Sequence, residues 1–358
     1  MGVNCSCFSI CKALGGARLA EKFTEQFRPF FLFIMKRLVL SLFALVCATV
    51  SFAQQNLVAT LTHGDEVSMF YGAYAYRDAM NAAVDGDFIN LSGGSFQACN
   101  ITKAVAVRGA GVEAALPTFI VNEFEIQIPT TTTERLTMEG LRLPSMVIRD
   151  TLQNAYFIKC NIAKVYAYKN SVNKNSLFVD CIISRIDLNL TQGSNTSSSM
   201  QLTNCLLLNY ECNKSTHTTN FINCVIVDGL SQSKLHCCSL LNCILVNTGS
   251  YTYSLPSTAS ATNCLAVGKN CFGSISAGVN NKYTAELAVF TDSDYTKELN
   301  DEAKAAFLGT DGTQVGMYGG PMPFSLTPTY PQITKMEVAS KTTADGKLSV
   351  NIEVSAAQ

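Results

Sequence analysis

One short segment combines aromatic and cationic side chains at a spacing that could bind a sugar. Lys164, Tyr166 and Tyr168 alternate with apolar residues, and Lys169 follows directly. Because successive side chains of a strand point to opposite faces, we expect Lys164 and both tyrosines on one face. Tyrosine rings offer flat apolar surfaces to sugar rings, and Lys or Arg can pair with a carboxylate or sulfate. The segment is a candidate glycan-binding site, although a solvated strand face without a ligand would show the same pattern.

A segment one repeat later carries charged residues at the matching positions. Arg185 takes the position of Lys164, and Asp187 takes that of Tyr166. If the chain is an enzyme, Lys164 or Arg185 is the candidate base that removes a proton from the substrate, with Asp187 beside it. The binding candidates are therefore Lys164, Tyr166, Tyr168, Lys169 and Arg185, and the catalytic candidates are Lys164, Arg185 and Asp187.

Clustered carboxylates are missing from this part of the chain. Calcium sites use several acidic ligands, and glycoside hydrolases use a pair of neighbouring carboxylates. Residues 155–275 contain only four scattered acids: Asp180, Asp187, Glu211 and Asp228. Zinc is also unexpected, because the cysteines form no CxxC pair. The sequence predicts no metal and no other cofactor, with Ca²⁺ expected only if the chain is a lyase.

Six cysteines occupy equivalent positions in an internal repeat. Each unit reads apolar, any residue, Asn, Cys, any residue, apolar, with Lys or Asp replacing Asn in two units. The steps between successive cysteines are 21, 24, 19, 19 and 21 residues, and the connections show no helical periodicity. A repeat of about 20 residues made of strands and turns is typical of one coil of a β-solenoid. The six are Cys160, Cys181, Cys205, Cys224, Cys243 and Cys264.

We expect these cysteines to form an interior column of small buried side chains. Disulfide bonds between stacked coils are the less favoured alternative, because parallel Cβ vectors fit the disulfide torsion poorly. The Asn column should mark a corner, because Asn tolerates the left-handed backbone conformation that a tight bend requires.

The N-terminal region has the pattern of a secretory signal peptide. Lys36 and Arg37 precede an apolar stretch and the small-x-small site Ser51–Ala53. We interpret residues 1–34 as a start-site miscall and 35–53 as the signal, so we expect a secreted or cell-surface protein. No later apolar run is long enough to be a transmembrane helix.

The remaining chain divides into a solenoid and a short extension. Residues 54–323 are expected to form the β-helix with its caps, including a capping helix within 74–84 and a short helix within 296–308. Residues 324–358 are expected to form a β-hairpin extension, because Leu348 to Val354 alternate apolar and polar residues after a turn at Asp345–Gly346.

The charge balance excludes one class of partner. The chain has 358 residues, with 26 Lys and Arg against 27 Asp and Glu, and a formal net charge of −1. Nucleic-acid binders usually carry a basic footprint, so we expect no nucleic-acid partner.

The first coil resembles a known group of proteins. Residues 82–96, with the sequence AAVDGDFINLSGGSF, resemble the opening of right-handed parallel β-helix proteins of the pectate lyase superfamily. The Phe-x-Asn-Cys coils and residues 312–320 are similar to exported β-helix proteins of Gram-negative gut-type bacteria. The resemblance spans roughly residues 60–323 and implies an all-β, right-handed parallel β-helix. It does not define a function, because the superfamily includes lyases, hydrolases, adhesins and surface proteins without assigned activity.

An apolar stripe on the later coils should point away from the core. It comprises Leu206, Val225, Ile244 and Leu265, one residue after each Cys, and Leu208, Val227, Val246 and Val267 two residues further on. An exposed patch of this size indicates a contact. We expect the terminal helix, the hairpin or a partner protein to cover it, unless the inward register shifts locally.

These observations favour an exported or surface-associated β-helix protein that binds a glycan or acts in adhesion without catalysis. The alternative is a carbohydrate-active enzyme, similar to polysaccharide lyases, with a Lys or Arg base on the outer face of the early coils.

Overall fold

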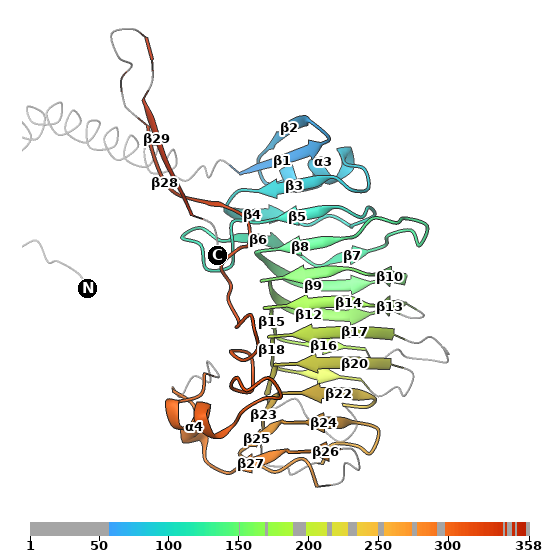
Figure 1. The fold of residues 1–358 in the computed structure, drawn as a ribbon. Coiled ribbons are helices and arrows are strands. Elements are labelled where there is room, and N and C mark those ends of the chain that lie inside the picture. The colour runs from blue at the N-terminus through green and yellow to red at the C-terminus, as the bar shows by residue number, and fades with distance from the viewer. Residues whose placement is uncertain are drawn as a thin grey trace, which may run out of the picture. The chain divides into compact units, whose positions relative to one another are not determined.

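In the computed structural model the chain folds into a parallel β-helix of about 8 turns (Figure 1). Only two α-helices interrupt the strands of the described part of the chain. The all-β solenoid expected from the cysteine repeat is therefore confirmed. The residues that the structure describes are 57–149, 151–168, 171–188, 198–212, 217–227, 235–249, 254–273, 278–291, 298–338, 341, 346, 347 and 349–355.

The first long sheet has twelve strands and begins with an antiparallel pair. In spatial order they are β2 (Glu66–Tyr71), β1 (Val58–His63), β3 (Phe88–Leu91), β5 (Ala106–Arg108), β8 (Thr137–Glu139), β11 (Tyr156–Ile158), β14 (Ser176–Val179), β17 (Ser198–Thr203), β20 (His217–Ile222), β22 (Cys238–Leu241), β24 (Ser260–Thr262) and β26 (Gly278–Val279). From β3 onward each strand pairs in parallel with the strand of the next coil.

The second long sheet carries the candidate site on its outer face. Its main path is β27 (Lys282–Thr284), β25 (Leu265–Val267), β23 (Ile244–Val246), β21 (Val225–Val227), β18 (Leu206–Leu207), β15 (Ile182–Ile183), β12 (Asn161–Ala167), β9 (Leu141–Ile148), β6 (Thr118–Val121) and β4 (Gly94–Gln97). Three short strands extend it sideways: β7 (Phe124–Ile126), β16 (Ile186–Asp187) and β19 (Tyr210–Glu211). A separate two-stranded parallel sheet pairs β10 (Thr151–Gln153) with β13 (Val172–Lys174).

The interior is built from equivalent residues that stack coil on coil. Phe157 of β11 lies in register with Phe178 of β14, and their rings are stacked with centroids 4.8 Å apart. The six repeat cysteines are buried beside this column. Stacking like on like fills the interior at the density of a folded core, because every coil presents side chains of similar shape.

The corner after each strand of the first sheet from β11 to β24 has a left-handed backbone. Asn204, Asn223, Asn242 and Asn263 all have φ between 50° and 55°. Lys159 and Asp180, which replace Asn in the first two cysteine units, adopt the same conformation with φ of 52°. Because Asn is the non-glycine residue that tolerates this region best, its recurrence fixes the bend of each coil.

The helix predicted before the first coil and the hairpin predicted at the end of the chain are both present. The helix α3 (Ala75–Ala82) buries Ala75, Tyr76, Ala79 and Met80 against the strands of the first coil. At the other end of the chain, β28 (Gln332–Val338) and β29 (Val350–Ser355) form an antiparallel hairpin.

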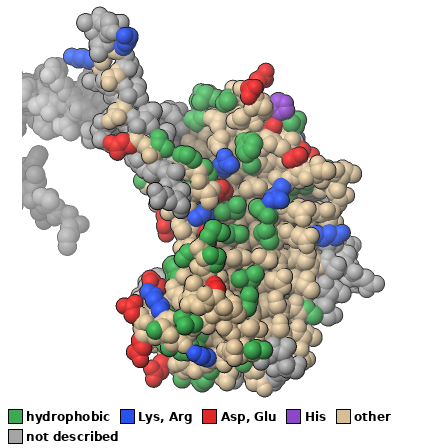
Figure 2. All heavy atoms as spheres, in the orientation of Figure 1, with side chains coloured by type: hydrophobic (Ala, Val, Ile, Leu, Met, Phe, Trp, Pro, Cys, Tyr) green, Lys and Arg blue, Asp and Glu red, His purple; other side chains and the backbone are tan. Residues whose placement is uncertain are grey.

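The outward apolar stripe is covered by the chain itself. Val225, Ile244 and Leu265 are buried in a second apolar core outside the solenoid. The covering residues come from the segment after β27, which includes the 3-10 helix Leu287–Val289 and α4 (Asp301–Ala306). Of the eight stripe residues, Leu208 stays outside the cover at 41% exposed. Acidic side chains gather on the outer side of this cover, at the lower left of the space-filling view (Figure 2). The stripe proposed as a protein-binding surface, Leu206, Val225, Ile244 and Leu265, is thus occupied by the terminal helix region.

The helix expected within 296–308 is shorter than its apolar spacing suggested. Asn300 caps α4, because its Oδ1 accepts a hydrogen bond from the Ala303 amide at 2.9 Å. Leu299 lies before this cap and forms a bridge with Phe290. The cap therefore starts the helix at Asp301.

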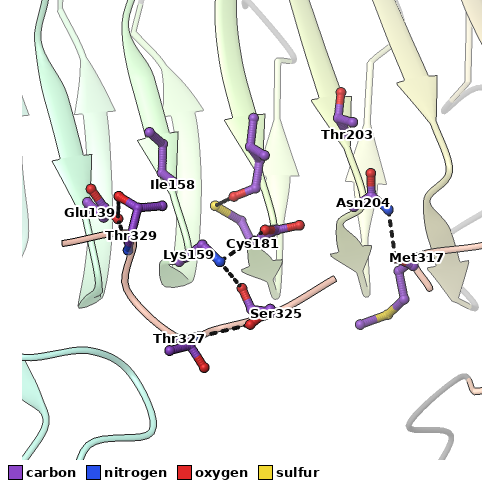
Figure 3. A network of polar contacts seen from close by, with 12 residues as sticks. Glu139, Ile158, Lys159, Cys181, Thr203, Asn204, Met317, Ser325, Thr327 and Thr329 are labelled. Carbon is purple, nitrogen blue, oxygen red and sulfur yellow. Dashed lines mark hydrogen bonds and ion pairs between the residues drawn. The ribbon is translucent and has the colours of Figure 1, made fainter. Parts of the chain in front are cut away.

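A strap of residues 308–330 follows α4 and runs back along the corner column toward the early coils (Figures 1 and 3). The Asn204 side chain donates two hydrogen bonds of 2.8 Å, to the carbonyl oxygens of Met317 and Gly319. The Thr310 amide donates to Asn242 Oδ1 at 2.9 Å. The corner residues thus satisfy backbone groups of the strap as well as bending each coil.

The strap also contacts the earlier coils beyond residue 323. Lys159 Nζ donates to the Ser325 carbonyl oxygen at 2.9 Å. Glu139 Oε1 accepts hydrogen bonds from the Thr329 amide at 2.8 Å and hydroxyl at 2.6 Å. The strap is therefore continuous with the β-helix on both sides of residue 323, where the sequence suggested a division.

Two further expectations concern the signal peptide and membrane-spanning helices. The signal peptide at 35–53 and the preceding residues 1–34 lie outside the described residues. Within the described part of the chain, no helix is long and apolar enough to cross a membrane.

Candidate functional site

The candidate residues lie on the outer face of the second sheet, where neighbouring strands place them in columns. Tyr166 of β12 is in register with Val147 of β9 on one side and with Asp187 of β16 on the other. Asp187 is in register with Glu211 of β19. Val165 faces the interior and is buried, which directs Tyr166 outward as the alternation predicted. We call this surface the polar-aromatic face: Glu123, Glu125, Arg149, Lys164, Tyr166, Tyr168, Arg185, Asp187 and Glu211.

Arg185 bridges two carboxylates at one end of this face. Its Nη2 atom donates to Asp187 Oδ2 at 3.1 Å and to Glu211 Oε2 at 2.9 Å. Asp187 and Glu211 are mostly buried, whereas Arg185 is more open. Hydrogen bonds to two carboxylates hold the guanidinium in one position.

Tyr166 lies at the centre of the face with its hydroxyl engaged. The hydroxyl donates to Glu123 Oε1 at 3.0 Å, and Lys164 Nζ lies 4.4 Å from the ring centroid. Partial burial, followed by the hydrogen bond to Glu123, raises the pKa of Tyr166. The phenol is therefore a neutral hydrogen-bond donor, and one side of its ring is occupied by a cation.

Tyr168 is the most open aromatic residue of the face. Its side chain is 45% exposed, and the Arg149 guanidinium carbon lies 3.8 Å from the ring centroid. Arg149 also pairs with Glu125, and this hydrogen bond is the main reason that the pKa of Arg149 is raised. The ring is therefore supported on one side by a fixed cation.

The structure brings most of the predicted residues together. Lys164, Tyr166, Tyr168, Arg185 and Asp187 share the face, whereas Lys169 lies outside the described residues. Sequence reasoning missed Glu123, Glu125, Arg149 and Glu211. Glu211 was visible as an acid four positions past the end of β18, but the other three lie on coils that lack the cysteine marker.

The face carries more negative than positive groups. Four carboxylates, those of Glu123, Glu125, Asp187 and Glu211, accompany the three cations Arg149, Lys164 and Arg185. Both arginines pair with carboxylates of the face, and Lys164 has no carboxylate partner within the described residues. Among the same residues, no group of three or more His, Cys, Asp or Glu side chains is arranged to hold a metal ion.

The cysteine column lies away from this face, in the interior. Each Sγ contacts backbone carbonyl oxygens; that of Cys181, for example, lies 3.3 Å from the Phe157 and Val179 oxygens. Burial raises the pKa of the Cys160, Cys205 and Cys243 thiols. No disulfide bond joins the cysteines of the described residues. Reagents and substrates cannot reach thiols buried in the interior, so this column contributes packing.

Comparison of the chain with protein families, curated proteins and solved structures found no match.

Proposed function

We propose that the protein is an exported or surface-associated β-helix protein that binds a neutral glycan at the polar-aromatic face without chemical turnover. The observation that carries this proposal is the Tyr168 ring, because Tyr168 is 45% exposed and the Arg149 guanidinium carbon lies 3.8 Å from the ring centroid. An exposed, immobilised ring is a surface on which a sugar ring can stack, and its rigidity reduces the entropy lost on binding.

The side chains around Tyr168 suit hydroxyl groups. The carboxylates of Glu123 and Glu125 are hydrogen-bonded to Tyr166 and Arg149, and a carboxylate has further lone pairs that can accept from a sugar hydroxyl. Fixed, partly satisfied polar groups give specificity in ligand sites, because they need no rearrangement on binding.

The charges favour a neutral over an acidic chain. A uronate or sulfate group would need a cation, but both arginines already pair with carboxylates. The remaining cation, Lys164, shares the polar-aromatic face with four carboxylates that would repel an anion. This refines the glycan class, because the sequence alone left neutral, uronic and sulfated chains open.

Export is proposed from the signal-peptide pattern of residues 35–53 and from the resemblance of the Phe-x-Asn-Cys coils and residues 312–320 to exported β-helix proteins of Gram-negative gut-type bacteria. A test is to express the chain from Met1 and from Met35 in a Gram-negative host and to determine the N-terminus of the exported protein. Cleavage after Ala53 supports the proposal, and a cytoplasmic, uncleaved product contradicts it.

The enzyme alternative has weaker support from the same residues. A catalytic base must be free to reach the substrate, whereas the Arg185 guanidinium is engaged by two carboxylates. Lys164 is then the base candidate that remains, and no observed contact is specific to catalysis.

One experiment tests binding and turnover together. Purified 54–358 is incubated with neutral, uronic and sulfated polysaccharides, with and without Ca²⁺, while retention and unsaturated products are measured. Retention of a neutral polysaccharide that is lost in Tyr168→Ala supports the proposal. Tyr283→Ala is the matched control, because Tyr283 is also 45% exposed but lies on β27, at the other end of the β-helix. Unsaturated products that disappear in Lys164→Ala would contradict a non-catalytic role.

A further inference from the structure

A small cavity lies beside the polar-aromatic face. It occupies the place where a strand of the preceding coil would otherwise pair with the two-stranded sheet. β10 and β13 pair in parallel, and β10 is the edge of that sheet. The preceding coil has a loop at residues 129–135 in the corresponding place, and the cavity lies between this loop and β10. Its volume is about 180 Å³.

The cavity has an apolar floor and a polar rim. The floor is formed by buried side chains that include Ile128, Leu136 and Leu152. The rim consists of Thr130, Thr132, Thr133, Glu134, Thr151, Gln153 and Asn154. Hydroxyl, amide and carboxylate groups above an apolar base match a sugar ring, which has hydroxyls at its edge and C–H groups on its faces.

The backbone of β10 adds further hydrogen-bonding groups. The Asn154 amide donates to the Lys174 carbonyl oxygen at 2.8 Å, so Asn154 and Leu152 direct their backbone groups toward β13. Because alternate residues of a strand direct these groups to opposite sides, Thr151 and Gln153 direct theirs toward the cavity. Within the described residues no strand pairs with that side of β10. Exposed backbone donors and acceptors are strong hydrogen-bonding partners for a ligand.

The cavity adjoins the end of the polar-aromatic face. Gln127, whose side chain donates to Glu125 at 3.2 Å, directly precedes Ile128 of the cavity floor. Arg149, which supports the Tyr168 ring, lies two residues before Thr151 of the rim. A ligand stacked on Tyr168 can therefore continue past Arg149 into the cavity.

We propose that the cavity binds the terminal neutral sugar of the glycan chain, so that the protein recognises the end of the chain. This inference rests on the proposed glycan-binding function. Sites for drug-sized ligands have volumes of roughly 300–1,000 Å³, so this smaller cavity suits a single ring. Glu134 is the one charged residue of its lining, and its carboxylate accepts from hydroxyls but repels a uronate.

Two variants of one loop distinguish binding in the cavity from binding elsewhere on the loop. Thr133 lines the cavity, whereas Thr131 belongs to the same loop, is exposed and does not line it. Thr133→Tyr fills the cavity, and Thr131→Tyr adds the same side chain outside it. Thermal unfolding of both variants confirms that they fold, and saturation-transfer NMR then measures binding of D-glucose, D-galactose, D-mannose, N-acetyl-D-glucosamine and D-glucuronic acid.

We expect at least one neutral monosaccharide to bind wild type and Thr131→Tyr, with at least a tenfold loss in Thr133→Tyr and no binding of glucuronic acid. Equal binding to both variants, or no binding of any neutral monosaccharide, would overturn the cavity assignment. Retention of neutral polysaccharides through Tyr168 is measured on the same samples. Retention without monosaccharide binding rejects the cavity and leaves the proposed function intact, whereas loss of both signals rejects both.

Discussion

Lys159 and Asp180, at the corners of two successive coils, form an ion pair beneath the strap, with Nζ and Oδ2 3.4 Å apart. They replace Asn at these two corners, and both are buried. Lys159 also donates to the Ser325 carbonyl oxygen (Figure 3). The two departures from the Asn repeat therefore mark the place where the strap turns toward the early coils.

This pair predicts a specific dependence of stability on pH. Burial raises the pKa of Asp180 from 3.8 to about 6, with Lys159 acting in the opposite direction. A carboxyl whose pKa is raised in the folded state binds its proton more tightly there, so its stabilising effect is present below about pH 4 and is lost as the pH rises to about 6. We expect the free energy of unfolding to fall by up to about 3 kcal/mol across this range.

The variant Asp180→Asn restores the Asn of the other corners and should remove this slope. Urea unfolding at several pH values checks the prediction, with Asp187→Asn as a control on a carboxylate of the polar-aromatic face. An unchanged slope in Asp180→Asn would show that another group titrates.

The hydrogen bonds between the corner residues and the strap predict that two equivalent asparagines contribute differently to the free energy of unfolding. Asn204→Ala removes two hydrogen bonds to strap carbonyl oxygens. Asn263→Ala removes a residue with the same backbone conformation but without a side-chain bond to the described strap. We expect Asn204→Ala to cost about 2–3 kcal/mol more in the free energy of unfolding. Equal costs would mean that only the left-handed conformation matters.

The close approach of the strap predicts which glycines can be replaced. A Cβ atom at Gly320 would lie 2.3 Å from the Asn223 side-chain nitrogen, whereas one at Gly312 would have no neighbour within 4 Å. Both glycines have positive φ, so the strain common to both substitutions cancels in the comparison. We expect Gly320→Ala to lower the free energy of unfolding by about 1–3 kcal/mol more than Gly312→Ala does, as measured by thermal unfolding. A smaller effect at Gly320 would contradict the packing of strap against corner.

The interior cysteines predict slow chemical modification. The six repeat thiols are buried, and burial raises the pKa values of three of them. Iodoacetamide should therefore leave all six unmodified in the folded protein and alkylate them once urea unfolds it. Mass spectrometry of tryptic peptides measures each site. Rapid alkylation of Cys205 in the folded protein would be inconsistent with an interior column.

The repeat made the β-helix predictable, whereas contacts between distant segments were not. Each coil contains a corner residue and a cysteine at equivalent positions, so the period of the sequence predicts the fold. Asn204 and Met317 are 113 residues apart, and nothing local to either signals their bond. The apolar stripe did predict that something must cover it, because eight outward aliphatic residues are unfavourable in water.

The candidate site was predictable only in part for a related reason. Tyr166 and Asp187 fall in one column because the cysteine steps fix the register between their coils. Glu125 and Arg149 lie on earlier coils without cysteines and with loops of different length, so their alignment with Tyr168 could not be counted from the sequence.

The affinity of a neutral glycan for the Tyr168 ring is the most direct test of the account. Isothermal titration of wild type, Tyr168→Ala and Tyr283→Ala with whichever neutral polysaccharide the wild type retains gives the three dissociation constants. The account predicts that Tyr168→Ala weakens binding about tenfold, or about 1.4 kcal/mol, while Tyr283→Ala matches wild type. Unchanged affinity in Tyr168→Ala would contradict the assignment of the polar-aromatic face as the binding site.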